Sequence, residues 1–278
     1  MRAFRVSVRI LDEDEASARL LEAGTLGIEV QPSSQERATL LAYFDDETTP
    51  ADVDAALRPV RDCGPAEAVA VPDVDWVARF REGFRGFRAG SFEVVPVWDV
   101  PNGRLPCDPG LLVVDPGRAF GTGTHETTRL CLRALEGQAA ARPLGRVLDV
   151  GTGAGLLAVA AAKLGASVVV AADNDPEATH AALGHASLNG VALRVVQADG
   201  GRAFRARAFD LVLANLMAPL LLERQAELSA LLAPGAALVL SGLLDTDVAD
   251  VGKAYAKLGP PALLADGEWA ALVFASRP

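Results

Sequence analysis

The segment VLDVGTGAG, residues 147–155, places three glycines directly after a run of apolar residues. Gly151, Gly153 and Gly155 have no side chain, so the backbone there can turn tightly and approach a bound molecule closely. Loops that bind dinucleotides favour the spacing G-x-G-x-x-G, with the pyrophosphate at the N-terminus of the following helix. The spacing here is G-x-G-x-G, preceded by Asp149, which disfavours a nicotinamide dinucleotide.

Two acidic residues follow the next apolar run, VVVAADNDP. Asp173 comes 22 residues after Gly151, and a carboxylate at this strand end can accept both hydroxyls of a ribose. Asp175 is the alternative, although it can instead cap the helix that Pro176 opens, and we favour Asp173. Asp199, in QADG, either receives an adenine amino group or is a solvated carboxylate in a turn.

The glycine motif with its preceding acid resembles the first motif of class I methyltransferases, which bind S-adenosylmethionine, a cofactor without a phosphate. Asn215, in DLVLANLMAP, would then face the place where the methyl group leaves the sulfonium. Many amino-group methyltransferases carry N-P-P-aromatic at this point. This chain keeps only the Asn, followed by Leu216, Met217, Ala218 and Pro219. The absence of the rest of this motif counts against the methyltransferases that modify adenine or glutamine.

A long Gly/Thr-rich segment, DPGRAFGTGTHETT, covers residues 115–128. It could be a phosphate cradle, but it lacks the Lys of a P-loop. A helix predicted over residues 126–135 follows it, and the N-terminus of that helix can take the carboxylate of methionine, with hydroxyls from Thr127 and Thr128. An ordinary helix cap by Thr124 does not explain so long a run. We expect the loop around Phe120 to exclude water from the site.

The elements that must position these residues are read from the apolar pattern. After residue 145, strands are predicted over residues 146–150, 168–172, 193–197, 211–214 and 237–241. Helices are predicted over residues 156–164, 176–189, 219–232 and 246–257. Nearly continuous apolar strands suit a parallel sheet covered on both faces, and residues 263–275 add two strands around Asp266-Gly267 that end the sheet antiparallel. The predicted fold is α/β, a doubly wound Rossmann-like domain.

The N-terminal part predicts a smaller α+β unit. Strands are predicted over residues 3–10, 26–31, 39–44 and 66–71, and helices over residues 12–23 and 52–60. This order, β-α-β-β-α-β, is that of the ferredoxin-like motif. Two further strands, over residues 92–97 and 111–115, precede the Gly/Thr-rich segment.

Between the two parts, aromatic and basic residues alternate at helical spacing. The aromatic residues are Trp76, Phe80, Phe84 and Phe87, and the basic residues are Arg79, Arg81, Arg85 and Arg88. Such a mixture could stack on RNA. We favour an amphipathic connector that docks on the larger domain, because arginine stems pack readily beside aromatic rings.

Composition narrows the class of protein further. Half of the 278 residues are hydrophobic and the formal net charge is −10, so the chain has a sizeable core, repels phosphate on average and attracts a basic partner. Cys63, Cys107 and Cys131 are far apart and form no disulfide or zinc pattern, and we expect no metal site. No stretch predicts a transmembrane helix and the first residues lack the features of a signal peptide, so we expect a cytoplasmic protein.

Taken together, the segments DPGRAFGTGTHETT, VLDVGTGAGLLAVAA, AADNDPEA, NGV, ANLMAPLL and LSGLL resemble those of the ribosomal-protein-L-eleven methyltransferases, the PrmA family. The resemblance implies an S-adenosylmethionine-dependent enzyme that methylates lysine side chains and the N-terminal α-amine of a large-subunit ribosomal protein. It implies cofactor contacts at Thr128, Gly151, Asp173 and Asn215, and we add Gly153 of the same loop. We hypothesise that Asn215 is the catalytic residue, which orients the amine through its side-chain carbonyl. Asn174 stands where the family usually has an apolar residue.

The same resemblance implies three parts with separate tasks. Residues 1–72 would be a ferredoxin-like substrate-recognition domain, residues 73–90 a linker helix that repositions it, and residues 91–278 the S-adenosylmethionine-binding methyltransferase domain. We expect no direct binding of nucleic acid or membrane. The alternative functions are an RNA methyltransferase, which would need a basic groove, and a non-catalytic ribosome assembly factor, which would bind the ribosomal protein without turnover.

Overall fold

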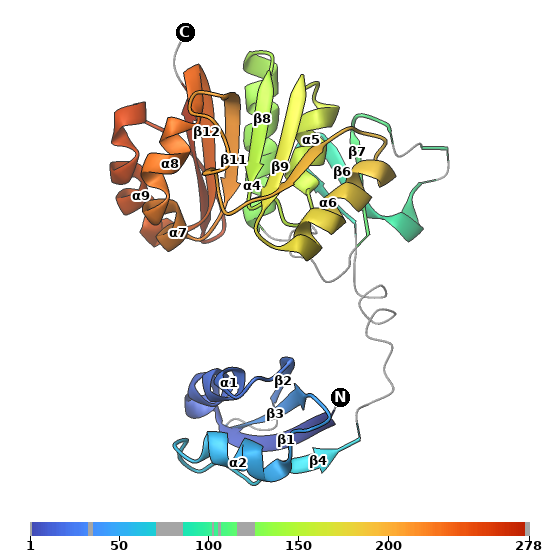
Figure 1. Cartoon of the computed structure of the whole chain (residues 1–278), viewed down its shortest axis with the longest axis vertical. Coiled ribbons are helices and arrows are strands. Elements are labelled where there is room, and N and C mark those ends of the chain that lie inside the picture. The colour runs from blue at the N-terminus through green and yellow to red at the C-terminus, as the bar shows by residue number, and fades with distance from the viewer. Residues whose placement is uncertain are drawn as a thin grey trace. The chain divides into compact units, whose positions relative to one another are not determined.

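The computed structural model describes residues 2–32, 36–70, 86–101, 103–104, 107–115 and 126–275. The chain divides into two compact units, Met1–Trp76 and Val77–Pro278, each of which is described by itself (Figure 1). The loop at 116–125, with Phe120 and Thr124, lies outside the described residues, as does most of the connector predicted at 73–90. The end of that connector differs from the prediction, because Phe87–Ala89 form a strand, β5, of the larger unit.

The smaller unit has its strands and helices in the order β-α-β-β-α-β, which is that of the ferredoxin-like motif. The strands β1 (Arg2–Arg9), β2 (Gly27–Pro32), β3 (Arg37–Phe44) and β4 (Glu67–Val69) form an antiparallel sheet in the order β2-β3-β1-β4. Its helices are α1 (Glu13–Glu22) and α2 (Pro50–Leu57). Alternate strand residues such as Phe4, Val6 and Leu40 are fully buried in one cluster with Leu20 and Val53 of the helices, so burial of one sheet face holds the unit together.

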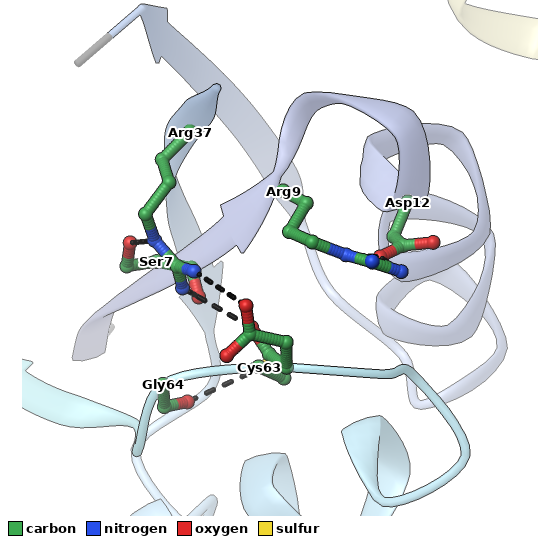
Figure 2. A network of polar contacts seen from close by, with 7 residues as sticks. Ser7, Arg9, Asp12, Arg37, Cys63 and Gly64 are labelled. Carbon is green, nitrogen blue, oxygen red and sulfur yellow. Dashed lines mark hydrogen bonds and ion pairs between the residues drawn. The ribbon is translucent and has the colours of Figure 1, made fainter. Parts of the chain in front are cut away.

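A polar network around Arg37 ties the loop before β4 to the sheet (Figure 2). The Arg37 Nε donates to the Ser7 hydroxyl at 2.9 Å, and its Nη1 donates to the Asp62 carboxylate at 3.1 Å. The N–H of Gly64 donates to the Ser7 carbonyl at 2.8 Å. Asp62 has a φ of 52°, a conformation that favours glycine, and the guanidinium also bonds its carbonyl. These bonds hold the loop against β1.

The larger unit contains a seven-stranded sheet in the order β10-β9-β8-β11-β12-β14-β13. Its strands are β8 (Arg146–Val150), β9 (Val168–Asp173), β10 (Arg194–Gln197), β11 (Phe209–Asn215), β12 (Leu232–Leu244), β13 (Ala262–Asp266) and β14 (Trp269–Ala275). The first five strands in this order are parallel, whereas β14 is antiparallel to both of its neighbours. The predicted doubly wound α/β fold with a terminal hairpin is confirmed.

Helices cover both faces of this sheet (Figure 1). On one face, α4 (Glu126–Ala141) and α5 (Leu156–Lys163) share a core with Val147 and Leu213. On the other, α7 (Ala218–Glu223), α8 (Gln225–Ala230) and α9 (Val248–Ala254) share a core with Leu148 and Val212. Helix α6 (Pro176–Leu188) packs on β9 and β10. Successive strand residues thus enter different cores, which is why the strands are apolar throughout.

The strands predicted before the Gly/Thr-rich segment form a separate sheet. In it β5 pairs antiparallel with β6 (Phe92–Pro96), which pairs parallel with β7 (Leu111–Val114). Strand β7 packs on α5 and α6, so this sheet covers the outer side of a helix layer. Within the described residues, no helix combines the length and the hydrophobicity that crossing a membrane requires.

One predicted helix, 219–232, is wrong as a single element. Helices α7 and α8 meet at Arg224, and β12 begins at Leu232. The N–H of Phe209 donates to the Leu231 carbonyl at 3.1 Å, so the chain already pairs with β11 where the helix was expected to continue. The helix predicted over 246–257 is also shorter, because only Val248–Ala254 is α-helical and 3-10 turns flank it.

Candidate functional site

The predicted site residues gather where three neighbouring strands of the larger sheet end. Gly151 follows β8, Asp173 is the last residue of β9, and Asn215 is the last residue of β11. The chain proceeds from β8 to β9 and β10 on one side and returns to β11 on the other. Open α/β sheets bind ligands at the carboxyl ends of their strands, at the point where the order reverses in this way.

The glycine loop between β8 and α5 is fixed to the end of β9. The N–H groups of Gly151 and Thr152 both donate to the Ala172 carbonyl, at 2.8 and 3.0 Å. Gly151 has a φ of 67°, and a Cβ at this position would lie 2.5 Å from Cδ2 of Leu216. A side chain there would need an unfavourable φ and a shift of the Leu216 side chain, so this position favours glycine.

The Asp173 carboxylate joins the glycine loop to the start of α6. Its Oδ2 accepts the N–H of Gly153 at 2.9 Å, and its Oδ1 accepts the N–H of Asp175 at 3.1 Å. An ionised carboxylate has about four lone-pair positions, so each oxygen keeps capacity for a ligand hydroxyl. Asp175 accepts the N–H of Glu177 at 2.8 Å and caps α6, which is the alternative role that the sequence offered for it.

A second carboxylate, Asp149, occupies the N-terminus of α5. It is 1% exposed, and it accepts hydrogen bonds from the Thr152 hydroxyl at 2.6 Å and from the backbone N–H of Ala158. Burial raises the pKa of Asp149 to about 6, against the lowering effect of these two bonds, and the negative field of Asp173 adds to the rise. Because a protein carboxylate already sits where dinucleotide-binding folds hold pyrophosphate, this loop is unsuited to a phosphate.

Two small hollows lie on either side of Gly151. Residues lining the first include Asp173, Asn174, Asp199, Gly200, Leu216 and Arg224. Residues lining the second include Thr128, Thr152, Gly153, Leu156 and Asn215. Gly151 lines both hollows, so a ligand lying across it would reach Asp173 on one side and Thr128 with Asn215 on the other. The structure thus brings all five predicted site residues to one place.

Strand β12 holds the segment after Asn215 in place through backbone contacts. The N–H of Leu216 donates to the Ser241 carbonyl at 3.0 Å, and the buried Ser241 hydroxyl donates to the Thr127 carbonyl at 3.2 Å. Gly242 has a φ of 84°, and a Cβ there would meet the backbone of Leu216. The sequence analysis did not predict this contact between β12 and Leu216. The Ser241-Gly242 pair inside an apolar strand was the available signal, because glycine in a strand often marks close approach of another backbone.

Asp199 is an exposed carboxylate with two arginines beside it. Its carboxylate pairs with the guanidinium of Arg224, which is largely buried, and lies 3.9 Å from Arg202. Arg224 was not foreseen as a site residue, because nothing in the α7–α8 sequence distinguishes it from a surface arginine. No three His, Cys, Asp or Glu side chains of the described ranges come together as metal ligands would.

The donors and acceptors at this edge suit a cofactor with ribose hydroxyls and no phosphate. Asp173 offers acceptors, Gly151 lets a ligand pass close to the backbone, and Asp149 blocks the anion site of α5. Fold and site together are those of a Rossmann-like, class I methyltransferase.

Comparison with known proteins identifies the family. The family model described as Ribosomal protein L11 methyltransferase (PrmA) matches residues 4–277. A ribosomal protein L11 methyltransferase of Geobacter sulfurreducens is 40% identical over 272 residues, covering 92% of this chain and 87% of the relative. That of Pelotomaculum thermopropionicum is 43% identical over 219 residues, covering 75% and 69%. The crystal structure of a ribosomal protein L11 methylase from Lactobacillus delbrueckii subsp. bulgaricus is similar with a TM-score of 0.61 at 31% identity, covering 70% of this chain and all of that one.

The chain belongs to the ribosomal protein L11 methyltransferase (PrmA) family. It is therefore an S-adenosylmethionine-dependent methyltransferase, and the predicted family, enzyme class and cofactor are confirmed.

The raised pKa of Asp149 predicts a difference in pH dependence between the native protein and Asp149→Asn. Between the ordinary pKa of 3.8 and the raised value of about 6, the unfolded chain has lost this proton while the folded chain keeps it, so the free energy of unfolding falls as pH rises. Relative to Asp149→Asn, the native protein should lose about 2 kcal/mol between pH 4 and pH 6, and a few tenths of a kcal/mol more by pH 8, where the loss is complete.

Urea titrations of both proteins across this range measure the difference. Groups that do not interact with Asp149 titrate alike in the two proteins, so their effects cancel. A difference that stays constant from pH 4 to pH 8 would show that Asp149 does not carry the raised pKa.

Proposed function

We propose that this enzyme transfers methyl groups from S-adenosylmethionine to amino groups of ribosomal protein L11, at lysine side chains and at the N-terminal α-amine. The family match over residues 4–277 carries the proposal, because the similar proteins of Geobacter sulfurreducens and Pelotomaculum thermopropionicum are named ribosomal protein L11 methyltransferases. The net charge of −10 favours a basic protein partner over nucleic acid or an anionic membrane. The enzyme would act in the cytoplasm, where ribosomal proteins are made.

In this proposal the two hollows divide the cofactor between them. Asp173 accepts the ribose hydroxyls, and the backbone at Gly151 and Gly153 passes close to the cofactor. Thr128, buried in the first turn of α4, receives the methionine end, where the helix N-terminus favours a carboxylate. Support comes from the lining of the hollows, since Asp173 lies on one side of Gly151 and Thr128 on the other.

Asn215 orients the amine that receives the methyl group. Bound S-adenosylmethionine supplies a methyl group that is already activated by the positive sulfur, so the protein's task is alignment. The amine must be neutral to attack, whereas a free lysine has a pKa of about 10.4 and an α-amine of about 7.7–8.0. Removal from water lowers either pKa, and the side-chain carbonyl of Asn215 then accepts an N–H and directs the lone pair. Half-burial of Asn215 beside Thr128 supports this role.

In this proposal residues 1–72, with a ferredoxin-like fold, are the substrate-recognition domain. Residues 73–90 are the linker that repositions this domain. The independent core of the smaller unit supports a separate binding task, since the cofactor residues all belong to the larger unit.

Incubation with radiolabelled S-adenosylmethionine, purified ribosomal protein L11 and, separately, large-subunit ribosomal RNA tests the proposed substrate. We expect label in the protein alone, and mass spectrometry should place it on lysines and the N-terminal amine. Label in the RNA would instead support the alternative of an RNA methyltransferase. Binding of L11 without any label would support a non-catalytic assembly factor.

Replacement of Asn215 should separate catalysis from cofactor binding. Asn215→Ala should slow methyl transfer on the order of 100-fold, because the amine is no longer aligned, and should leave the cofactor Kd within a few-fold. Asn215→Asp keeps an acceptor oxygen and should recover part of the rate. Single-turnover rates and calorimetry measure the two effects, and an unchanged rate in Asn215→Ala would remove this residue from the mechanism.

Replacement of Asp173 should weaken cofactor binding itself. Asp173→Ala loses charged acceptors for two hydroxyls, each worth about 1.5–3 kcal/mol, so the Kd for S-adenosylmethionine should rise by a factor of about 100 or more. Asp175→Ala is the matched control, because it removes a helix cap worth about 1 kcal/mol of stability and should change the Kd only a few-fold. Calorimetry that finds equal affinities for the two variants would argue against the ribose contact.

A further inference from the structure

The segment that follows β10 is bound to the junction of α7 and α8. The N–H of Gly201 donates to the Glu227 carboxylate in the first turn of α8. Gly200 has a φ of 67°, and a Cβ there would overlap both Nη1 of Arg224 and Oε1 of Glu227. Because Gly200 has no side chain, the guanidinium and this carboxylate lie directly against the backbone of the segment.

Arg224 orients the Asp199 carboxylate of this segment. Among the described residues, only Oδ1 of Asp199 accepts a hydrogen bond, from Nη2 of Arg224. Its Oδ2 lies 3.9 Å from Nη1 of Arg202, which is beyond hydrogen-bond distance. The Arg224 side chain is 12% exposed and that of Asp199 is 54% exposed. A largely buried cation thus holds an exposed carboxylate whose second oxygen keeps capacity for a ligand.

Asp199 lies beside the proposed ribose acceptor. Gln197, the last residue of β10, pairs with Asp173 of β9, and the N–H of Ala198 donates to the Asp173 carbonyl at 2.8 Å. Asp173 and Asp199 line the same hollow. Since the base of a nucleoside is attached directly to its ribose, a ribose held at Asp173 has this hollow beside its base.

The chemistry of the carboxylate selects the group that it can bind. An ionised carboxylate accepts hydrogen bonds and donates none. Adenine carries an amino group at position 6, which donates, whereas its ring nitrogens accept. A base with a carbonyl at position 6 would place an acceptor against the Asp199 carboxylate.

We propose that Arg224 is a positioning residue for recognition of the adenine base, which rests on the proposed ribose contact at Asp173. Arg224 holds Asp199 at the hollow so that its second oxygen accepts the 6-amino group. Without the guanidinium, Asp199 would turn toward solvent and away from the like charge of Asp173. Arg224 thus acts through Asp199 and does not touch the cofactor.

Two ligands that differ at position 6 of the base test this recognition. S-Adenosylhomocysteine, the product that methyl transfer leaves, has the amino group, and S-inosylhomocysteine has a carbonyl in its place. Calorimetry of the native protein should find the adenosyl ligand bound on the order of 30-fold more tightly, because the inosyl ligand loses a hydrogen bond to a charged group. Equal affinities would overturn the proposed contact of Asp199 with adenine.

Three variants test the role of Arg224 itself. Arg224→Met removes the guanidinium, and the preference should fall to about fivefold or less, through weaker binding of the adenosyl ligand alone. Arg224→Lys keeps a positive charge and should recover part of the preference. Arg202→Met is the matched control, because it removes a charge near Asp199 but no hydrogen bond to it, and it should keep the native preference.

Two results with Arg224→Met would overturn the proposal. One is an unchanged preference; the other is an equal loss of affinity for both ligands, since general damage to the hollow does not distinguish an amino group from a carbonyl. If this variant fails to fold, a crystal structure of the native protein with S-adenosylhomocysteine decides. Asp199 should then bind Arg224 through one oxygen and the 6-amino group through the other, and a base lying away from Asp199 would contradict the proposal.

Failure of the proposed function gives different results. If the ribose does not lie at Asp173, Asp173→Ala will bind both ligands as the native protein does. If ribosomal protein L11 is not the substrate, the methylation assay fails while both affinities stay as expected.

Discussion

The placement of a buried carboxylate at the start of α5 determines how the cofactor edge of the larger unit is built. Asp149 satisfies the Thr152 hydroxyl and the N–H of Ala158, and these are groups that a helix start otherwise leaves for solvent or an anionic ligand. The loop between them must close around this carboxylate, and it does so through glycines with positive φ. A loop shaped in this way presents its backbone to the ligand and has no free anion site, which separates it from dinucleotide-binding loops built on the same strand-turn-helix unit.

Most contacts that shape the site are made by the backbones of neighbouring strands. The Ala172 carbonyl of β9 holds two N–H groups of the glycine loop, and the Ser241 carbonyl of β12 holds Leu216. Asp173 and Asn215 are the last residues of their strands, so the register of the parallel sheet places their side chains on either side of Gly151. Parallel pairing therefore fixes the spacing between Asp173 and Asn215, the residues proposed for the ribose and methyl ends of the cofactor.

The doubly wound fold could be predicted from local patterns, whereas the five candidate site residues came from such patterns together with the family resemblance, and their roles stay predictions. Apolar strands, Asp175-Pro176 at a helix start and glycines before α5 each have a physical meaning within a few residues. Contacts between segments far apart in the chain leave no local sequence pattern from which they could be predicted. Ser241 with Thr127, Asn189 with Val113, and Arg224 with Asp199 join residues far apart in the chain, and no periodicity within either partner indicates the other. The break of the predicted helix at Arg224 and the start of β12 at Leu232 likewise depend on pairing with β11.

The ion pair between Arg224 and Asp199 balances charge in the hollow that Asp173 also lines. Asp173 and Asp199 line the same hollow, and two carboxylates near each other repel unless a cation lies close. Arg224, the residue between α7 and α8, directs its guanidinium to Asp199, and its guanidinium also lies 3.5 Å from the Glu227 carboxylate. The guanidinium of Arg224 thus supplies the positive charge that allows a second carboxylate, Asp199, in the hollow of the proposed ribose acceptor Asp173.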